Sequence, residues 1–177
     1  MSIWIRRSIK IFVTLILLVV GVGLVLPTEY NVVRSVSINA MPEDIHVYVG
    51  DLTKWDLWSP WKEEDPTIVT TLGEKTSGVG AYQSWVAKDG DGSLTFTKVS
   101  PSQGIEYDLF FDGGEYHSIA GMHYNRGAEA TTTVMWRMTG NMDMPVFGGY
   151  FAMLMDSMAG PMFERGLEKL KAIVEKA

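Results

Sequence analysis

The sequence predicts an α+β protein in which a curved antiparallel β-sheet wraps around a long C-terminal helix, behind one N-terminal transmembrane helix. Three observations lead to this fold class. An uncharged apolar run lies near the N-terminus, short strand-like segments separated by turn signals fill the middle, and residues 145–177 have helical periodicity. The chain has 177 residues, of which 46% are hydrophobic and 20% charged, enough for one domain with its own core.

The apolar run extends from Ile11 to Leu26 and follows a flank that contains Arg6, Arg7 and Lys10. A membrane-spanning helix usually has about 20 apolar residues, and this run approaches that length before Pro27 ends it. The residues before Pro27 are bulky, whereas a cleavage site needs small ones, so an uncleaved signal anchor is favoured over a cleaved signal peptide.

This interpretation divides the chain into a signal-anchor segment, residues 1–27, and a globular domain, residues 28–177. The positive-inside rule places the N-terminus in the cytoplasm and the domain outside it, in the periplasm or at the cell surface. The membrane would then be a partner through residues 11–26.

Charge and composition exclude other partners and some chemistry. Three of the 15 basic residues lie in the first ten positions, which leaves 12 against all 21 acidic residues in the rest. An acidic surface of this kind disfavours nucleic acid. The chain has no cysteine, which excludes disulfides, a thiol nucleophile and cysteine-bound metal.

The globular part is expected to begin with a strand at residues 30–38, where β-branched residues are frequent. A helix follows from Pro42 to about Val49, with acidic residues in its first turn and Gly50 at its end. Residues 53–61 form a second short helix or turn.

Six further strands are expected, each bounded by Gly, Asp, Asn or Pro turn signals: residues 67–72, 80–87, 93–99, 105–111, 116–124 and 130–138. Apolar and polar residues alternate within several of them, as for Tyr107 and Leu109 against Asp108, so each strand presents one apolar face. The C-terminal helix has apolar residues every three to five positions, and Gly160-Pro161 predicts a kink or break in it. One helix cannot cover so wide a sheet, which leaves space between them.

Several motifs carry a family resemblance. The segment from Trp55 to Trp61 (WDLWSPW), Gly78-Val79-Gly80 with Trp85, the last strand from Val134 to Gly140, and the helical segment from Met155 to Leu167 are similar to motifs of the START-like (SRPBCC) superfamily of polyketide cyclases, dehydrases and lipid-transport domains. The resemblance covers residues 28–177 and implies a helix-grip fold with a cavity between sheet and helix.

Candidate catalytic groups do not form a cluster in the sequence. His46, His117 and His123 are spaced too widely to bind one metal ion, and are interpreted as solvent-facing or structural. Glu106 and Asp108 lie opposite the apolar face of their strand, and residues 63–65 are a surface loop. No catalytic residue, metal or cofactor is therefore assigned.

Aromatic residues and methionines indicate a function more clearly than the candidate catalytic groups do. Seven of the 11 methionines fall in the last 40 residues, and methionine adapts to variable apolar shapes. Together with inward-facing aromatic residues they predict a hydrophobic ligand pocket formed by Trp58, Trp61, Tyr82, Trp85, Phe96, Tyr107, Trp136, Met138, Phe151, Leu154 and Met158.

Three functions follow from these observations. The first is binding, or transport, of a small hydrophobic or lipid-like ligand at the membrane surface. The second is an enzyme of the cyclase or dehydrase kind that uses Tyr82, Glu106 or a histidine. The third is an envelope protein-interaction module with a filled core, whose protein partners are unknown.

Overall fold

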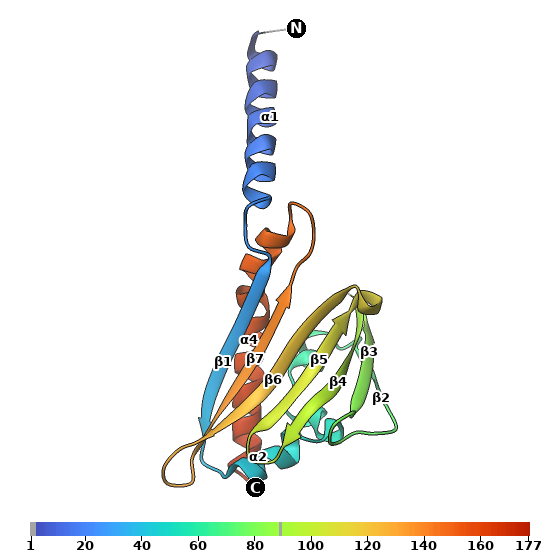
Figure 1. The fold of residues 1–177 in the computed structure, drawn as a ribbon, viewed down its shortest axis with the longest axis vertical. Coiled ribbons are helices and arrows are strands. Elements are labelled where there is room, and N and C mark those ends of the chain that lie inside the picture. The colour runs from blue at the N-terminus through green and yellow to red at the C-terminus, as the bar shows by residue number, and fades with distance from the viewer. Residues whose placement is uncertain (1–2, 89) are drawn as a thin grey trace.

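The computed structural model describes residues 3–88 and 90–177. Its seven strands are β1 (Glu29–Ile38), β2 (Val69–Leu72), β3 (Tyr82–Ala87), β4 (Gly90–Ser100), β5 (Gly104–Phe111), β6 (Tyr116–Arg126) and β7 (Thr132–Asn141). The helices are α1 (Ile3–Gly23), α2 (Pro42–Val49), η1 (Leu52–Leu57), α3 (Trp61–Glu64), η2 (Asp112–Gly114) and α4 (Gly148–Val174). All strands form one antiparallel sheet in the order β1-β7-β6-β5-β4-β3-β2, so the first and last strands pair (Figure 1).

The predicted α+β architecture, a curved antiparallel sheet with a long C-terminal helix, is confirmed (Figure 1). Gly160-Pro161 was predicted to cause a kink or a break; the break is wrong, because α4 continues as one helix through Pro161. Proline removes a single backbone donor, and the packed turns on either side keep the helix continuous.

The concave face of the sheet carries the core, as the alternation in the strands predicts. On β7, Val134 and Trp136 are fully buried and Met138 nearly so, whereas Arg137 between them is exposed. The small Ala120 on β6 is paired in register with both Tyr107 on β5 and Met138 on β7. The small side chain of Ala120 therefore lies between two larger side chains on the neighbouring strands of the same face.

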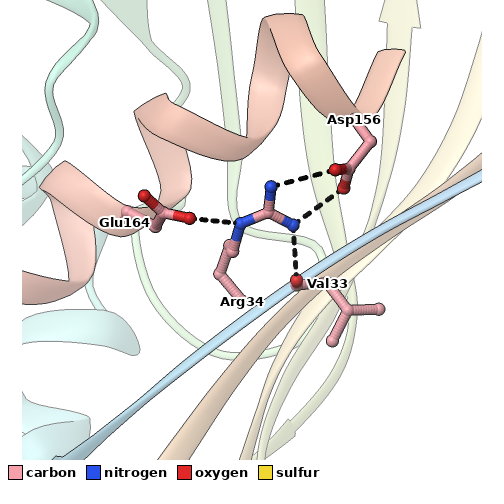
Figure 2. Close-up of polar contacts among 4 residues, drawn as sticks. All are labelled: Val33, Arg34, Asp156 and Glu164. Carbon is pink, nitrogen blue, oxygen red and sulfur yellow. Dashed lines mark hydrogen bonds and ion pairs between the residues drawn. The ribbon is translucent and has the colours of Figure 1, made fainter. Parts of the chain in front are cut away.

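Helix α4 packs mainly over β1, at one side of the sheet (Figure 1). Figure 2 shows how Arg34 of β1 holds it: Nη1 and Nη2 donate to the two carboxylate oxygens of Asp156 at 2.7 and 3.0 Å, and Nε donates to Glu164 at 2.5 Å. Gly160 makes this approach possible, because an ideal Cβ there would lie 2.1 Å from Nη2 of Arg34. The bidentate geometry fixes α4 against the edge of the sheet.

Helix α1 projects away from the sheet (Figure 1), and its side chains from Trp4 to Val19 are all exposed. The predicted single-pass membrane topology with an extracytoplasmic domain is wrong, since within residues 3–88 and 90–177 no helix is long and apolar enough to cross a bilayer. The helix ends at Gly23 and includes Arg6, Arg7 and Lys10. Charged residues inside a helix weigh heavily against its insertion.

Candidate ligand site: an apolar cavity beneath the C-terminal helix

A cavity of about 350 Å³ lies where α4 leaves the sheet uncovered. Strands β2 to β5 and β7 form its floor, the middle of α4 forms one wall, and the η1–α3 segment forms the other. Its lining is predominantly apolar and consists of Trp55, Asp56, Ser59, Trp61, Lys62, Ile68, Thr70, Gln83, Trp85, Leu94, Tyr107, Leu109, Phe111, Trp136, Met138, Met155, Met158, Ala159, Met162 and Phe163.

The η1 wall is held by two tryptophans. The indole N–H of Trp55 donates to the carbonyl of Val49 at 2.9 Å, and that of Trp58 donates to the carbonyl of Tyr48 at 3.1 Å. Both carbonyls belong to the last turn of α2, where backbone acceptors have no partner within the helix. The two side chains thus satisfy the end of α2 and fix the position of the segment that closes the cavity.

Trp136 is the centre of the cavity's aromatic surface. Its ring stacks on Phe163 of α4 with centroids 4.2 Å apart and an interplanar angle of 3°. Its indole N–H donates to the hydroxyl of Tyr107 at 2.9 Å. Gly166 gives the indole room, because a Cβ there would approach it to 2.8 Å. Burial raises the pKa of Tyr107, against the opposing effect of the Trp136 hydrogen bond, so its phenol stays neutral.

Among the described lining residues, the charged ones lie at the η1–α3 wall. Asp56 and Lys62 both line the cavity and pair with each other at 2.5 Å. Two more ion pairs, Arg165 with Glu64 and Lys169 with Glu63, connect α3 to α4. These exposed pairs contribute little to stability, but they hold the wall against the helix at one end of the cavity.

Six of the predicted ligand residues line the cavity: Trp61, Trp85, Tyr107, Trp136, Met138 and Met158. The other five lie elsewhere. Trp58 and Phe96 are buried within the core, and Tyr82, Phe151 and Leu154 have exposed fractions of 40%, 44% and 52%. The structure therefore does not place these five side chains in the lining of this cavity.

Helix geometry explains why Phe151 and Leu154 lie outside the cavity. Successive residues of an α-helix are rotated by about 100°, and the wall is formed by Met155, Ala159 and Met162 rather than by the row that contains Phe151 and Leu154. Met155 and Met162 belong to the methionine cluster noted in the sequence. Leu94, Leu109 and Phe111 belong to the apolar faces that the strand alternation predicts, and they line the floor although they were not assigned to the pocket.

The side chains considered for catalysis lie outside the cavity. Glu106 forms an ion pair with Lys98, and Asp108 accepts a hydrogen bond from His117 at 3.0 Å on the outer face of the sheet. His46 is half-buried beside the hydroxyl of Tyr124, and burial lowers its pKa. Within the described residues no three His, Asp or Glu side chains converge as metal ligands.

A second hollow of about 590 Å³ lies on the opposite face of the sheet, over β1, β7 and β6. It is wide and open, and two of its polar side chains are paired with each other, with Nε of Arg137 donating to Asn31 at 2.9 Å. Ligand pockets usually enclose most of the ligand's surface. The more enclosed cavity beneath α4 is therefore the better candidate site.

A sheet that grips a C-terminal helix around an apolar cavity defines the helix-grip class. The chain belongs to the polyketide cyclase/dehydrase and lipid transport family, whose model matches residues 30–175. No curated protein sequence matches the chain.

Solved structures share the fold at low sequence identity. Protein CV1439 of Chromobacterium violaceum is 16% identical with a TM-score of 0.59, over 82% of this chain and 96% of its own. TTHA0849 of Thermus thermophilus is 17% identical with a TM-score of 0.60, over 81% and 96%. DynU16, from the dynemicin biosynthetic locus, is 16% identical with a TM-score of 0.55, over 82% of this chain and 47% of its own.

Proposed function

We propose that this protein binds a small hydrophobic or lipid-like molecule in the cavity between the sheet and α4. The observation that carries the proposal is a partly enclosed space of about 350 Å³ lined by four tryptophans and four methionines. Pockets that bind small molecules are concave and mostly apolar, and carry a few polar groups that orient the ligand. Membership of a family described by lipid transport as well as cyclisation supports the same function.

The cavity's size limits the ligand. A volume of 350 Å³ corresponds to about a dozen water molecules at roughly 30 Å³ each. A compact ring system or a short chain fills such a space, whereas a long acyl chain would extend through the mouth. Met155, Met158 and Met162 on the α4 wall give that wall an adaptable shape.

Binding is better supported than catalysis. The family also includes cyclases and dehydrases, which need groups that transfer protons. In the described lining, Asp56 is the one carboxylate, and it is engaged by Lys62. An interaction module with a filled core is less well supported, because the space beneath α4 is not filled by side chains.

Native mass spectrometry of the purified full chain, followed by organic extraction, tests the proposal. We expect a co-purifying neutral apolar molecule, or saturable uptake of a naphthalene probe that quenches tryptophan fluorescence. Trp55, Trp61, Trp85 and Trp136 line the cavity and report directly on occupancy. Absence of both a bound molecule and saturable quenching would contradict a ligand-binding function.

A further inference from the structure

Tyr107 lines the apolar cavity and carries a hydroxyl proton that no described residue accepts. Its side chain is 2% exposed and lines the cavity. The hydroxyl oxygen accepts the hydrogen bond from Trp136, and among residues 3–88 and 90–177 no acceptor takes the hydroxyl proton. Because the indole N–H occupies one lone pair of the oxygen, the phenol is oriented and its own O–H remains available.

The cavity also lacks a charge that a ligand ion would need. Among the described lining residues only Asp56 and Lys62 are charged, and each neutralises the other at 2.5 Å. An ionised ligand group at the floor would lose its hydration and find no counter-ion, which strongly disfavours its binding. Tyr107 itself remains neutral because burial raises its pKa.

We propose that the protein selects uncharged apolar molecules that carry a hydrogen-bond-accepting oxygen, such as a ketone, and that the Tyr107 hydroxyl donates to that oxygen while Trp136 orients the phenol. This inference rests on the proposed binding function. It adds the chemical class of the ligand and assigns a specificity-determining pair of residues, Tyr107 and Trp136.

Three aromatic probes of equal size test the inference: 2-acetylnaphthalene, 2-isopropenylnaphthalene, which has C=CH2 in place of C=O, and the anion 2-naphthoate. Full-chain protein is titrated with each, well above the pKa of a carboxylic acid. One added hydrogen bond predicts that the ketone binds roughly 3- to 10-fold more tightly than the alkene. Naphthoate is expected to bind at least about 100-fold more weakly than the ketone. The carbonyl stretch of bound ketone should shift to lower frequency.

Tyr107→Phe should abolish the preference for ketone over alkene and the infrared shift. Tyr82→Phe is the matched control, because Tyr82 is exposed and lies outside the cavity. Tyr107→Phe leaves the Trp136 N–H without an acceptor. The double variant Tyr107→Phe/Trp136→Phe removes both the hydroxyl and the N–H, and it should also bind ketone and alkene equally.

The outcomes separate the two proposals. Equal affinity of the wild type for ketone and alkene, or an unshifted carbonyl band, would overturn the role of Tyr107 and leave hydrophobic binding in place. Tight binding of naphthoate would overturn the selection for uncharged ligands. Failure of all three probes to bind would overturn the binding function, and the inference with it.

Discussion

Replacing Ala159 with phenylalanine tests whether the space beneath α4 is accessible to added apolar atoms. Ala159 lies on the α4 wall and lines the cavity between Met155 and Met162. A benzyl group at this position points into the space that a ligand is proposed to occupy. We expect Ala159→Phe to lose probe uptake while the protein remains fully folded.

The expected stability follows from two opposing contributions. Burial of a phenylalanine side chain contributes about 1.5–3 kcal/mol relative to an exposed one. Phenylalanine has a lower helix propensity than alanine by up to about 0.7 kcal/mol. In a cavity of 350 Å³ that is partly open, a net gain of about 1 kcal/mol is expected, which raises the melting temperature by roughly 2–4 °C for a chain of this size.

Ala172→Phe is the matched control, because Ala172 lies on the exposed side of the same helix and outside the cavity. It reports the propensity cost without any burial. Thermal unfolding by circular dichroism and tryptophan quenching are measured on both variants. If Ala159→Phe is less stable than the control by ~1–3 kcal/mol, the region is overpacked and therefore solid, and the argument for a cavity fails.

Four further predictions concern the frame around the cavity. A chain that starts at Thr28 should unfold cooperatively with a melting temperature close to that of the full chain, since the strands and α4 form the core without α1; a non-cooperative transition in calorimetry would contradict this domain boundary. Arg34→Met should lower the melting temperature more than Arg34→Lys does, because only arginine makes the bidentate contact to Asp156. The Arg34 guanidinium lowers the pKa of Asp156. The stability that this pair contributes is therefore present above the ordinary aspartate pKa and is lost as pH falls through the lowered value. The acid unfolding of Arg34→Met should lack this contribution. Burial lowers the pKa of His46, so the wild type should lose stability as pH falls from about 6.5 towards that lower value. The variant His46→Leu should lose less stability over the same pH range. A His46 pKa at or above that of a free imidazole in an NMR titration would contradict this prediction.

The sheet was largely predictable because strand alternation has only two phases. Once Trp136 and Met138 are assigned to the apolar face of β7, their inward direction follows, and the floor of the cavity follows with them. The motif between Trp55 and Trp61 also located the η1–α3 wall. The motif did not indicate which of its tryptophans faces the cavity. Trp58 is buried and donates a hydrogen bond to α2, whereas Trp61 is the first residue of α3 and lies at the cavity.

The face of α4 was not predictable in the same way. Phe151, Met153, Leu154 and Met155 place apolar groups on several sides of the helix, so the sequence has no single apolar stripe in its first half. Arg34 of β1 contacts Asp156 and Glu164 on one side of α4, and these contacts join positions 122 and 130 residues apart. Nothing local to either segment indicates that pairing.

The pairing of β1 with β7 has a consequence for how the chain folds. Strands β2 to β7 are each joined to their neighbour by a short connection, whereas the side-chain bonds between β1 and β7 connect residues 96 and 106 positions apart. Closing so long a loop costs more chain entropy than forming a hairpin, and it slows folding. The hairpins from β2 to β7 can therefore assemble before β1 docks, and α4, which packs mainly on β1, has its platform only after that step. This order predicts that the space beneath α4 is the last part of the domain to form, and that the rate of β1 docking limits how soon the cavity is present.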